Sequence, residues 1–183
     1  NNAIIFGGGD HLPSAEPLGE RYTFGFVGRL LPHKGAHIVI SALPADASII
    51  IAGQARDEYY EHLKNLAHGK NVTFIEDASD VIVASIYRSI RFLLVPSVEQ
   101  YGAQTYARPE LLGLVALEAL AAGTPVIGSD VGGLSQVLRT AGQRVLPPGD
   151  IQAWAEGLSA ALTGEPPTVP SVDFTWGLWQ IAV

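Results

Sequence analysis

The chain has 183 residues, of which 48% are hydrophobic and 16% charged, and its formal net charge at pH 7 is −7. This length predicts a single domain, and the apolar content excludes a disordered chain. The acidic balance argues against a dedicated nucleic-acid binder, and the absence of cysteine excludes a disulfide scaffold, a thiolate nucleophile and a cysteine-based zinc site.

Strand-like and helix-like segments alternate along the chain from residue 22 onward. Short apolar runs rich in β-branched or aromatic residues predict strands at 22–27, 47–52, 71–75, 91–95, 125–128 and 144–146. The stretches between them predict helices at 34–43, 56–67, 78–89, 111–122, 134–140 and 151–162, with Asp77 or Ser79 capping the third and Asp150 the last. Residues 98–109 show no clear period. The alternation predicts an α/β fold: a Rossmann-like open parallel sheet of about six strands with helices on both faces.

The stretch after the first strand carries the clearest sign of a binding site, because open parallel sheets bind ligands at the carboxyl ends of their strands. Gly28 ends the strand, so a ligand can approach the backbone closely, and Arg29 and Lys34 follow before the first helix. Two cations beside a helix N-terminus favour a diphosphate site. The alternative is a solvated loop with ordinary surface charges. Basic residues are few in this acidic chain, so their placement here favours the binding site.

A lone carboxylate in an apolar helix is the second sign. Glu118 is flanked by alanine and leucine residues, and burial of an unpaired carboxylate is costly. It could accept hydrogen bonds from ligand hydroxyls, or it could face solvent or pair with an arginine. Gly113 allows a ligand close to the backbone, and the amides of residues 113–115 at the helix start could meet a phosphate.

Three segments are expected along the chain. Residues 1–20 are a Gly- and Pro-rich connection, 21–164 form the sheet domain, and 165–183 are a proline-rich linker with an aromatic tail. We expect the tail, which holds Trp176 and Trp179, to dock on this domain or on a missing one. The chain has no methionine, so we expect a fragment, a processed product or a recombinant piece. It shows no signal peptide and no apolar run long enough to span a bilayer.

Weaker signals do not change this interpretation. His33 and His37 are four residues apart, but no third ligand is evident, so surface histidines are a better interpretation than a metal site. The run at 6–9 neither follows a strand nor precedes a helix, and therefore does not predict a dinucleotide site. The lack of cysteine fits a reducing compartment, and we expect a cytoplasmic protein.

Taken together, these residues resemble the retaining GT-B glycosyltransferases of family 4, the glycosyl transferases group 1 type. The matching pieces are V-G-R-x(4)-K-G at 27–35, P-S at 96–97, E-x(7)-E at 110–118, A-L-A-A-G-T-P-V-I at 119–127, V-G-G-L at 131–134 and L-P-P-G-D at 146–150. Each piece is weak alone, but their joint order and spacing are specific. The resemblance runs from about residue 22 to residue 162.

The resemblance implies the C-terminal, nucleotide-sugar-binding half of a GT-B enzyme, with residues 1–20 as a remnant of the inter-domain connection. It implies that Arg29 and Lys34 hold the diphosphate and stabilise it as the leaving group, and that Glu110 binds the donor sugar; these three are the expected catalytic residues. Glu118 is expected to bind the ribose. The other implied donor-binding residues are Gly28, Ile75, Glu76, Gly113, Leu114 and Val115. No cofactor and no metal is implied, because Arg and Lys supply the positive charge.

The chain departs from the family pattern in two ways. The first motif glutamate usually lies close behind P-S, whereas here residues 98–109 intervene and contain a look-alike, Glu99. We prefer Glu110, because only it keeps the seven-residue spacing to Glu118. The insert is then expected to overhang the donor site, where it would shape sugar choice or meet the acceptor. The second departure is that the acceptor-binding N-terminal domain is missing.

The expected function is therefore the donor-binding part of a retaining hexosyltransferase that uses a UDP- or GDP-sugar and an acceptor hydroxyl. The expected partners are the nucleotide-sugar and the missing acceptor-binding domain. No nucleic-acid partner is expected. Peripheral association with a membrane would be possible only through the missing domain. Two alternatives remain open: a non-catalytic binding or interaction module on the same fold, and another GT-B enzyme such as a nucleotide-sugar epimerase.

Overall fold

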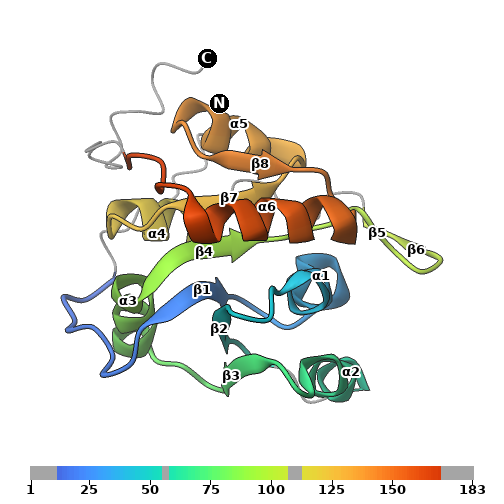
Figure 1. The fold of residues 1–183 in the computed structure, drawn as a ribbon, viewed down its shortest axis with the longest axis horizontal. Helices are drawn as coiled ribbons and strands as arrows, with labels where there is room; N and C mark the ends of the chain where they lie inside the picture. The colour runs from blue at the N-terminus through green and yellow to red at the C-terminus, as the bar shows by residue number, and fades with distance from the viewer. Residues whose placement is uncertain (1–11, 55–57, 107–112, 170–183) are drawn as a thin grey trace, which may run out of the picture.

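Six parallel strands form one sheet in the computed structural model, which describes residues 12–54, 58–106 and 113–169 (Figure 1). The strand order is β3-β2-β1-β4-β7-β8. The bounds are β1 Tyr22–Val27, β2 Ser48–Ala52, β3 Asn71–Ile75, β4 Ile90–Val95, β7 Val126–Ser129 and β8 Arg144–Leu146. The open parallel sheet predicted from the sequence is confirmed.

The central strands form because their apolar runs are buried on both faces of the sheet. Ile49, Ile50 and Ile51 of β2 are each at most 1% exposed, and β-branched side chains of this kind suit a pleated surface that is covered on both sides. Strand β1 lies between β2 and β4. Its residue Phe24 is paired with Ile49 of β2 on one side and with Phe92 of β4 on the other. Since β1 and β4 are parallel neighbours, their carboxyl ends lie side by side.

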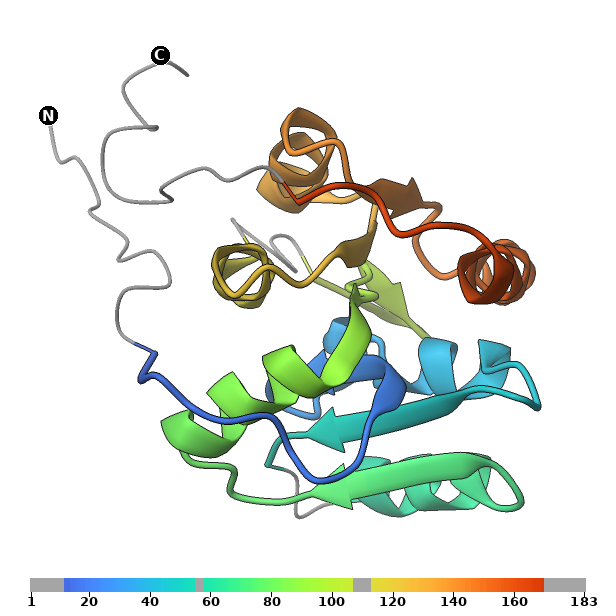
Figure 2. The same cartoon turned by 60° about the vertical axis from the view of Figure 1, so that its left-hand side comes forward.

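Helices cover both faces of the sheet (Figures 1 and 2). One layer holds α1 Ala36–Ala42, α2 Glu58–Ala67 and α6 Ile151–Thr163, and the other holds α3 Asp80–Ser89, α4 Leu114–Ala121 and α5 Gly132–Thr140. In the first layer α6 packs against α1, so the last helix covers the first. Trp154 of α6 is fully buried there and donates from Nε1 to the carbonyl oxygen of Pro147 at 3.1 Å.

Two helices begin at side-chain caps that the sequence predicts. At the start of α6, Oδ1 of Asp150 accepts a hydrogen bond from the amide of Ala153 at 3.0 Å. Of the two candidates for α3, Ser79 is the N-cap and accepts from the amide of Ile82. Asp77 instead lies ahead of the helix with a φ of 54°. Each cap satisfies one backbone donor that the first turn would otherwise leave unpaired.

Two local features differ from the expectation. The first helix begins at Ala36 rather than at residue 34, because Pro32 starts a short 3₁₀ helix, η2 Pro32–Lys34, and Gly35 follows it with a left-handed φ of 76°. The insert, whose sequence shows no clear period, contains a hairpin of β5 Gln100–Tyr101 and β6 Gln104–Thr105.

The ends of the sheet domain are only partly described. Ahead of β1, the amide of Leu18 donates to Oγ of Ser89 at 2.6 Å, which holds this segment against the end of α3. Residues 170–183, with both tail tryptophans, lie outside the described residues, and the division into three segments stays a prediction. None of the helices in the described ranges combines the length and apolar content needed to cross a membrane.

Candidate functional site

A pocket opens where the chain reverses its direction of travel across the sheet. From β1 the sheet grows outward through β2 and β3, and from β4 it grows the opposite way through β7 and β8. The loops that follow β1 and β4 therefore diverge, which is where open parallel sheets bind ligands. The pocket has a volume of about 210 Å³ and is lined by Phe26, Val27, Gly28, Arg29, Lys34, Leu94, Val95, Ser97, Leu114 and Val115.

Glycines let the loops around this pocket pack closely. A Cβ atom at Gly35 would lie 1.9 Å from the carbonyl oxygen of Pro96, and one at Gly53 would lie 1.9 Å from the carbonyl oxygen of Gly28. Gly28 itself has a φ of 148°. A side chain at residue 35 or 53 would push these loops apart, so the glycines maintain the backbone spacing around the pocket.

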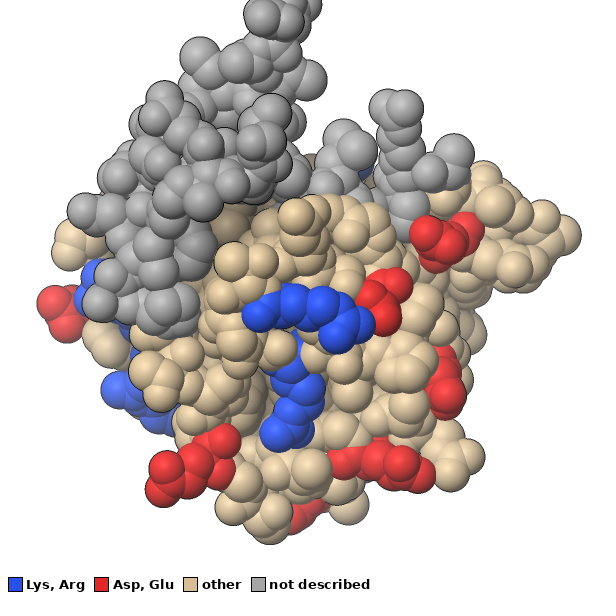
Figure 3. Space-filling model, turned by 90° about the horizontal axis from the view of Figure 1, so that it is seen from above, with Lys and Arg blue, Asp and Glu red and all other residues tan. Residues whose placement is uncertain are grey.

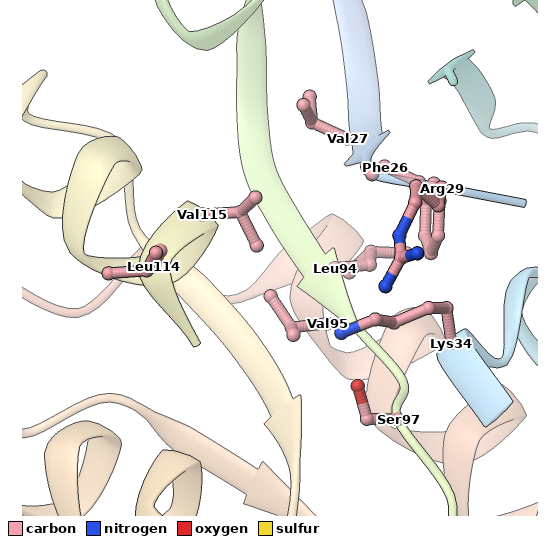
Figure 4. A pocket seen from close by; sticks show the side chains of 10 residues that line it. Phe26, Val27, Arg29, Lys34, Leu94, Val95, Ser97, Leu114 and Val115 are labelled. Carbon is pink, nitrogen blue, oxygen red and sulfur yellow. The ribbon is translucent and has the colours of Figure 1, made fainter. Parts of the chain in front are cut away.

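Arg29 and Lys34 bring two positive charges to the pocket. Arg29 follows the end of β1 and Lys34 ends η2, and Figure 4 shows both side chains directed into the space between β1, β4 and α4. Arg29 is exposed, and its side chain makes no hydrogen bond or ion pair with any described residue. The structure thus brings together the two cations that the sequence predicts for a diphosphate.

Most other basic side chains in the described ranges hold the fold together. They donate to backbone carbonyls or pair with carboxylates: Arg21 to Arg88, Lys70 to Ile40 and Ser41, Arg91 to Leu162 and Gly164, Arg144 to Gly157, Arg139 with Asp130, and Lys64 with Glu61. On the face shown in Figure 3, two basic side chains touch near the centre and others lie at the left, with acidic side chains around them, so this face carries no extended basic patch. Such a face does not suit a phosphate backbone.

Helix α4 presents its N-terminus to the same pocket. Its N-cap is Gly113, with a left-handed φ of 66°, and no side chain caps this end. Leu114 and Val115 of the first turn line the pocket. A Cβ atom at Gly113 would lie 2.6 Å from Cδ1 of Leu134, so the start of the helix is tightly seated. The positive end of the α4 dipole therefore adds to the charge of Arg29 and Lys34.

Glu118 lies one turn further along α4 and does not line the pocket. Its side chain is half-buried, and its Oε2 accepts a hydrogen bond from the hydroxyl of Tyr87 at 2.8 Å. Burial, together with the neighbouring carboxylate, raises the pKa of Tyr87 far above its usual value, so the hydroxyl remains a donor. The expected binding of a ribose by Glu118 stays a prediction.

Ile75 and Glu76 lie at the end of the edge strand β3 and do not line the pocket either. The Ile75 carbonyl oxygen accepts from the amide of Gly53 at 3.0 Å, which ties the ends of β2 and β3 together. Oε1 of Glu76 accepts from the hydroxyl of Tyr60 at 2.7 Å. The pKa of Tyr60 is raised to about 12, mainly by desolvation and secondly by this hydrogen bond. These two residues border the carboxyl edge of the sheet at a distance from the cations.

Glu110 lies outside the described residues, so its expected role at the donor sugar stays a prediction. The look-alike Glu99 is exposed at the base of the hairpin and does not line the pocket. The described part of the insert, 98–106, contributes no lining residue, although Ser97 directly before it does.

The expectation that His33 and His37 are surface histidines is wrong. Both are half-buried. The ring of His33 lies 4.6 Å from that of Tyr106, and the ring of His37 lies 5.0 Å from that of Tyr101, measured between centroids. These two histidines therefore connect the insert to η2 and α1.

Five lining residues were not among the predicted site residues: Phe26, Val27, Leu94, Val95 and Ser97. All of them lie at or next to the carboxyl ends of β1 and β4, so the positions of the two strand ends were a signal that could have found them. Among the described residues no group of three or more His, Asp or Glu side chains could hold a metal ion. The expectation of a metal-free, cofactor-free site stays a prediction.

Known proteins match both this sequence and this fold. The family model "Glycosyl transferases group 1" matches residues 11–169. The D-inositol 3-phosphate glycosyltransferase of Corynebacterium glutamicum is 32% identical over 152 residues, which cover 75% of this chain and 34% of that protein. The sucrose-phosphate synthase of Thermosynechococcus elongatus superposes with a TM-score of 0.63 at 28% identity, over 80% of this chain and 37% of that chain.

A further solved structure shares the fold. HepE of Anabaena, solved in complex with UDP and glucose, superposes with a TM-score of 0.65 at 24% identity, over 79% of this chain and 39% of that chain. The present chain therefore spans only about a third of the length of these glycosyltransferases and synthases.

Proposed function

Because the chain belongs to the glycosyl transferases group 1 family, we propose that it forms the donor-binding part of a retaining GT-B glycosyltransferase. The proposed reaction moves a hexose from a nucleoside diphosphate sugar, with UDP or GDP as the nucleotide, to an acceptor hydroxyl. The anomeric configuration of the sugar is kept.

The observation that carries this proposal is the convergence of Arg29, Lys34 and the N-terminus of α4 on one pocket. When the glycosidic bond of the donor breaks, negative charge develops on the terminal phosphate. Two cations and a helix N-terminus would stabilise that charge, and groups already near the phosphate lower the barrier with less reorganisation. The same positive charge would take the place of the divalent cation that other sites use to stabilise a diphosphate leaving group.

The remaining residues are assigned to the other parts of the donor. We assign Glu110 to the sugar hydroxyls and Glu118 to the ribose hydroxyls, because carboxylates accept strong hydrogen bonds from hydroxyl groups. Ile75 and Glu76 would border the base at the edge of the sheet. An oxygen of the leaving phosphate would take the proton from the acceptor hydroxyl on the same face of the sugar, which accounts for retention.

The acceptor would bind outside this chain. The relatives are about three times as long as the matched segment, and the proposal places the acceptor in the part that this chain does not include. We therefore expect this chain to bind the donor or its nucleoside diphosphate but to turn over little on its own.

Calorimetric titration without metal tests the proposal. UDP, GDP and ADP would be titrated, followed by the glucose or mannose conjugate of any nucleotide that binds. UDP comes first, because HepE was solved with it. Saturable binding of one nucleotide that is clearly weakened in Arg29→Ala supports the donor site. Arg88→Ala is the matched control, because Arg88 is exposed on α3 and absent from the pocket lining. Absence of binding by a folded sample would contradict donor binding by this chain and favour a non-catalytic module.

A further inference from the structure

The insert that interrupts the family's motif spacing packs against the turn that carries Lys34. We propose that residues 98–106, called here the hairpin clamp, hold this turn so that Lys34 reaches the diphosphate, with Tyr106 as the positioning residue. The proposal deepens the donor-binding function and rests on it.

The turn η2 has little internal support. It is three residues long, it contains no buried residue, and no side chain caps its N-terminus. Its backbone bonds run from the amide of Lys34 to Leu31 at 2.9 Å and from the amide of Gly35 to Pro32 at 3.1 Å. Single 3₁₀ turns have poor hydrogen-bond geometry, and segments with few buried contacts open easily. The position of Lys34 therefore depends on whatever packs against η2.

The base of the hairpin clamp packs against η2 at His33. The amide of Val98 donates to the carbonyl oxygen of His33 at 2.8 Å, and Val98 is buried. The ring of Tyr106 lies on the His33 ring with 4.6 Å between centroids. The amide of Tyr106 donates to the carbonyl oxygen of Glu99 at 2.7 Å and closes the hairpin. Both ends of the clamp thus hold the residue directly before Lys34.

The clamp is itself fixed to the helix layer. The ring of Tyr101 meets the rings of His37 in α1 and Tyr59 in α2 edge-on, with centroids 5.0 and 5.9 Å apart. Nδ1 of His37 and the hydroxyl of Tyr59 are 2.8 Å apart and share a hydrogen bond. Desolvation, assisted by the nearby His62, lowers the pKa of His37 to about 4, so the His37 ring is uncharged at neutral pH. The hairpin clamp therefore bridges α1, α2 and η2.

The position of the Lys34 ammonium group matters because it has to form a hydrogen bond with the phosphate, not only add positive charge near it. A charge-assisted hydrogen bond from an ammonium to a phosphate oxygen needs about 2.7–2.9 Å between heavy atoms. A shift of about 1 Å in a supporting segment loosens such a contact. Arg29 follows β1 directly and does not belong to η2, so loss of the clamp should weaken the contribution of Lys34 and leave that of Arg29 in place.

A double-mutant cycle with UDP tests this coupling. Tyr106→Ala is expected to weaken the calorimetric Kd for UDP by about three- to tenfold in the wild-type chain and to have no further effect in Lys34→Ala. Tyr106→Phe keeps the ring on His33 and removes only the hydroxyl that donates to Oε1 of Gln104, so it should bind like the wild type. An equal loss in both backgrounds would overturn the proposal, because Tyr106 would then act on the whole fold.

Hydrogen exchange without ligand tests the clamp independently of donor binding. In Tyr106→Ala the amides of Lys34, Gly35 and Val98 should exchange faster, while those of β1 and β4 keep their wild-type rates. Unchanged rates at the three amides overturn the proposal whether or not UDP binds. Faster exchange, in a chain whose wild type binds none of UDP, GDP and ADP, would support the hairpin clamp and contradict the donor site. Should Tyr106→Ala not fold, Tyr106→Leu removes the ring stack with less loss of apolar volume and is interpreted in the same way.

Discussion

The hydroxyl of Tyr87 donates a 2.8 Å hydrogen bond to Oε2 of Glu118 and so joins α3 to α4. Tyr87 is fully buried and Glu118 is half-buried. Burial and the neighbouring carboxylate both raise the pKa of Tyr87, which keeps the proton on the phenol. The carboxylate that we assign to the ribose is thus oriented by a helix that does not line the pocket.

Tyr87→Phe should lower the free energy of unfolding by about 1–3 kcal/mol, because it takes a donor away from a half-buried carboxylate. Urea denaturation measures this loss. Tyr22→Phe is the matched control, since its hydroxyl bonds the exposed Glu20 at 2.9 Å and should contribute less. Equal losses in the free energy of unfolding would show that the Tyr87–Glu118 hydrogen bond stabilises the fold no more than the exposed Tyr22–Glu20 bond does.

Arg29→Ala and Lys34→Ala should each weaken nucleoside diphosphate binding by about 1–3 kcal/mol, as expected for the loss of a charge-assisted hydrogen bond. Calorimetry on the two variants and on Arg88→Ala measures the difference. The affinity of the two pocket variants should also depend less on salt concentration, because each variant lacks one of the charges that salt screens. Unchanged affinity in both pocket variants would rule out the phosphate assignment.

Gly35→Ala should destabilise the chain and disturb the pocket. Its φ is 76°, and a Cβ there would lie 1.9 Å from the carbonyl oxygen of Pro96, so the backbone after β4 must move. Gly69→Ala separates the two effects, because Gly69 has a φ of 75° with no atom within 4 Å of the added Cβ. We expect about 1 kcal/mol of loss for Gly69→Ala from backbone strain alone, and at least twice that for Gly35→Ala. Urea denaturation compares them, and similar losses would contradict the close packing at Pro96.

Acidification should weaken the cluster around His37. Its pKa falls from 6.5 to about 4 on folding, mainly through burial and secondly through His62. The unfolded chain therefore takes up the proton first. The stability that the neutral ring contributes is complete above about pH 6.5 and is lost as the pH falls toward 4.

Urea denaturation of the wild type and of His37→Gln across this pH range measures the effect. The wild type should lose more stability than the variant, because glutamine does not titrate. His68→Gln, at an exposed position, should follow the wild type. Parallel curves for the wild type and His37→Gln would show that the His37 ring does not titrate abnormally.

The sheet and the position of the pocket were predictable because their signals are local. The run Ile49–Ile51 identifies a strand buried on both faces, and Gly28 and Gly53 mark where two strands end. Parallel strands place their carboxyl ends at one edge, so Arg29 and Lys34 could be assigned to the same site from the chain order alone.

The contacts that orient these groups were not predictable, because they depend on packing between segments distant in the chain. Tyr87 and Glu118 are 31 residues apart, and nothing in the local sequence pairs them. The hairpin has two-residue strands, too short to show a period of two. His33 and His37 looked like surface residues for the same reason, since only the folded insert brings Tyr106 and Tyr101 onto them.

Helix α6 fills the same core as α1, with Trp154 and Leu158 packed in one cluster with Ile38. The ribosome synthesises the chain from the N-terminus, so Arg29 and Lys34 leave the ribosome long before α6 does. Until Trp154 has been made, the part of α1 that packs against α6 is uncovered, and η2 leads into an incomplete helix layer. A nascent chain that stops short of α6 therefore carries every described residue of the pocket lining but lacks the helix that covers α1.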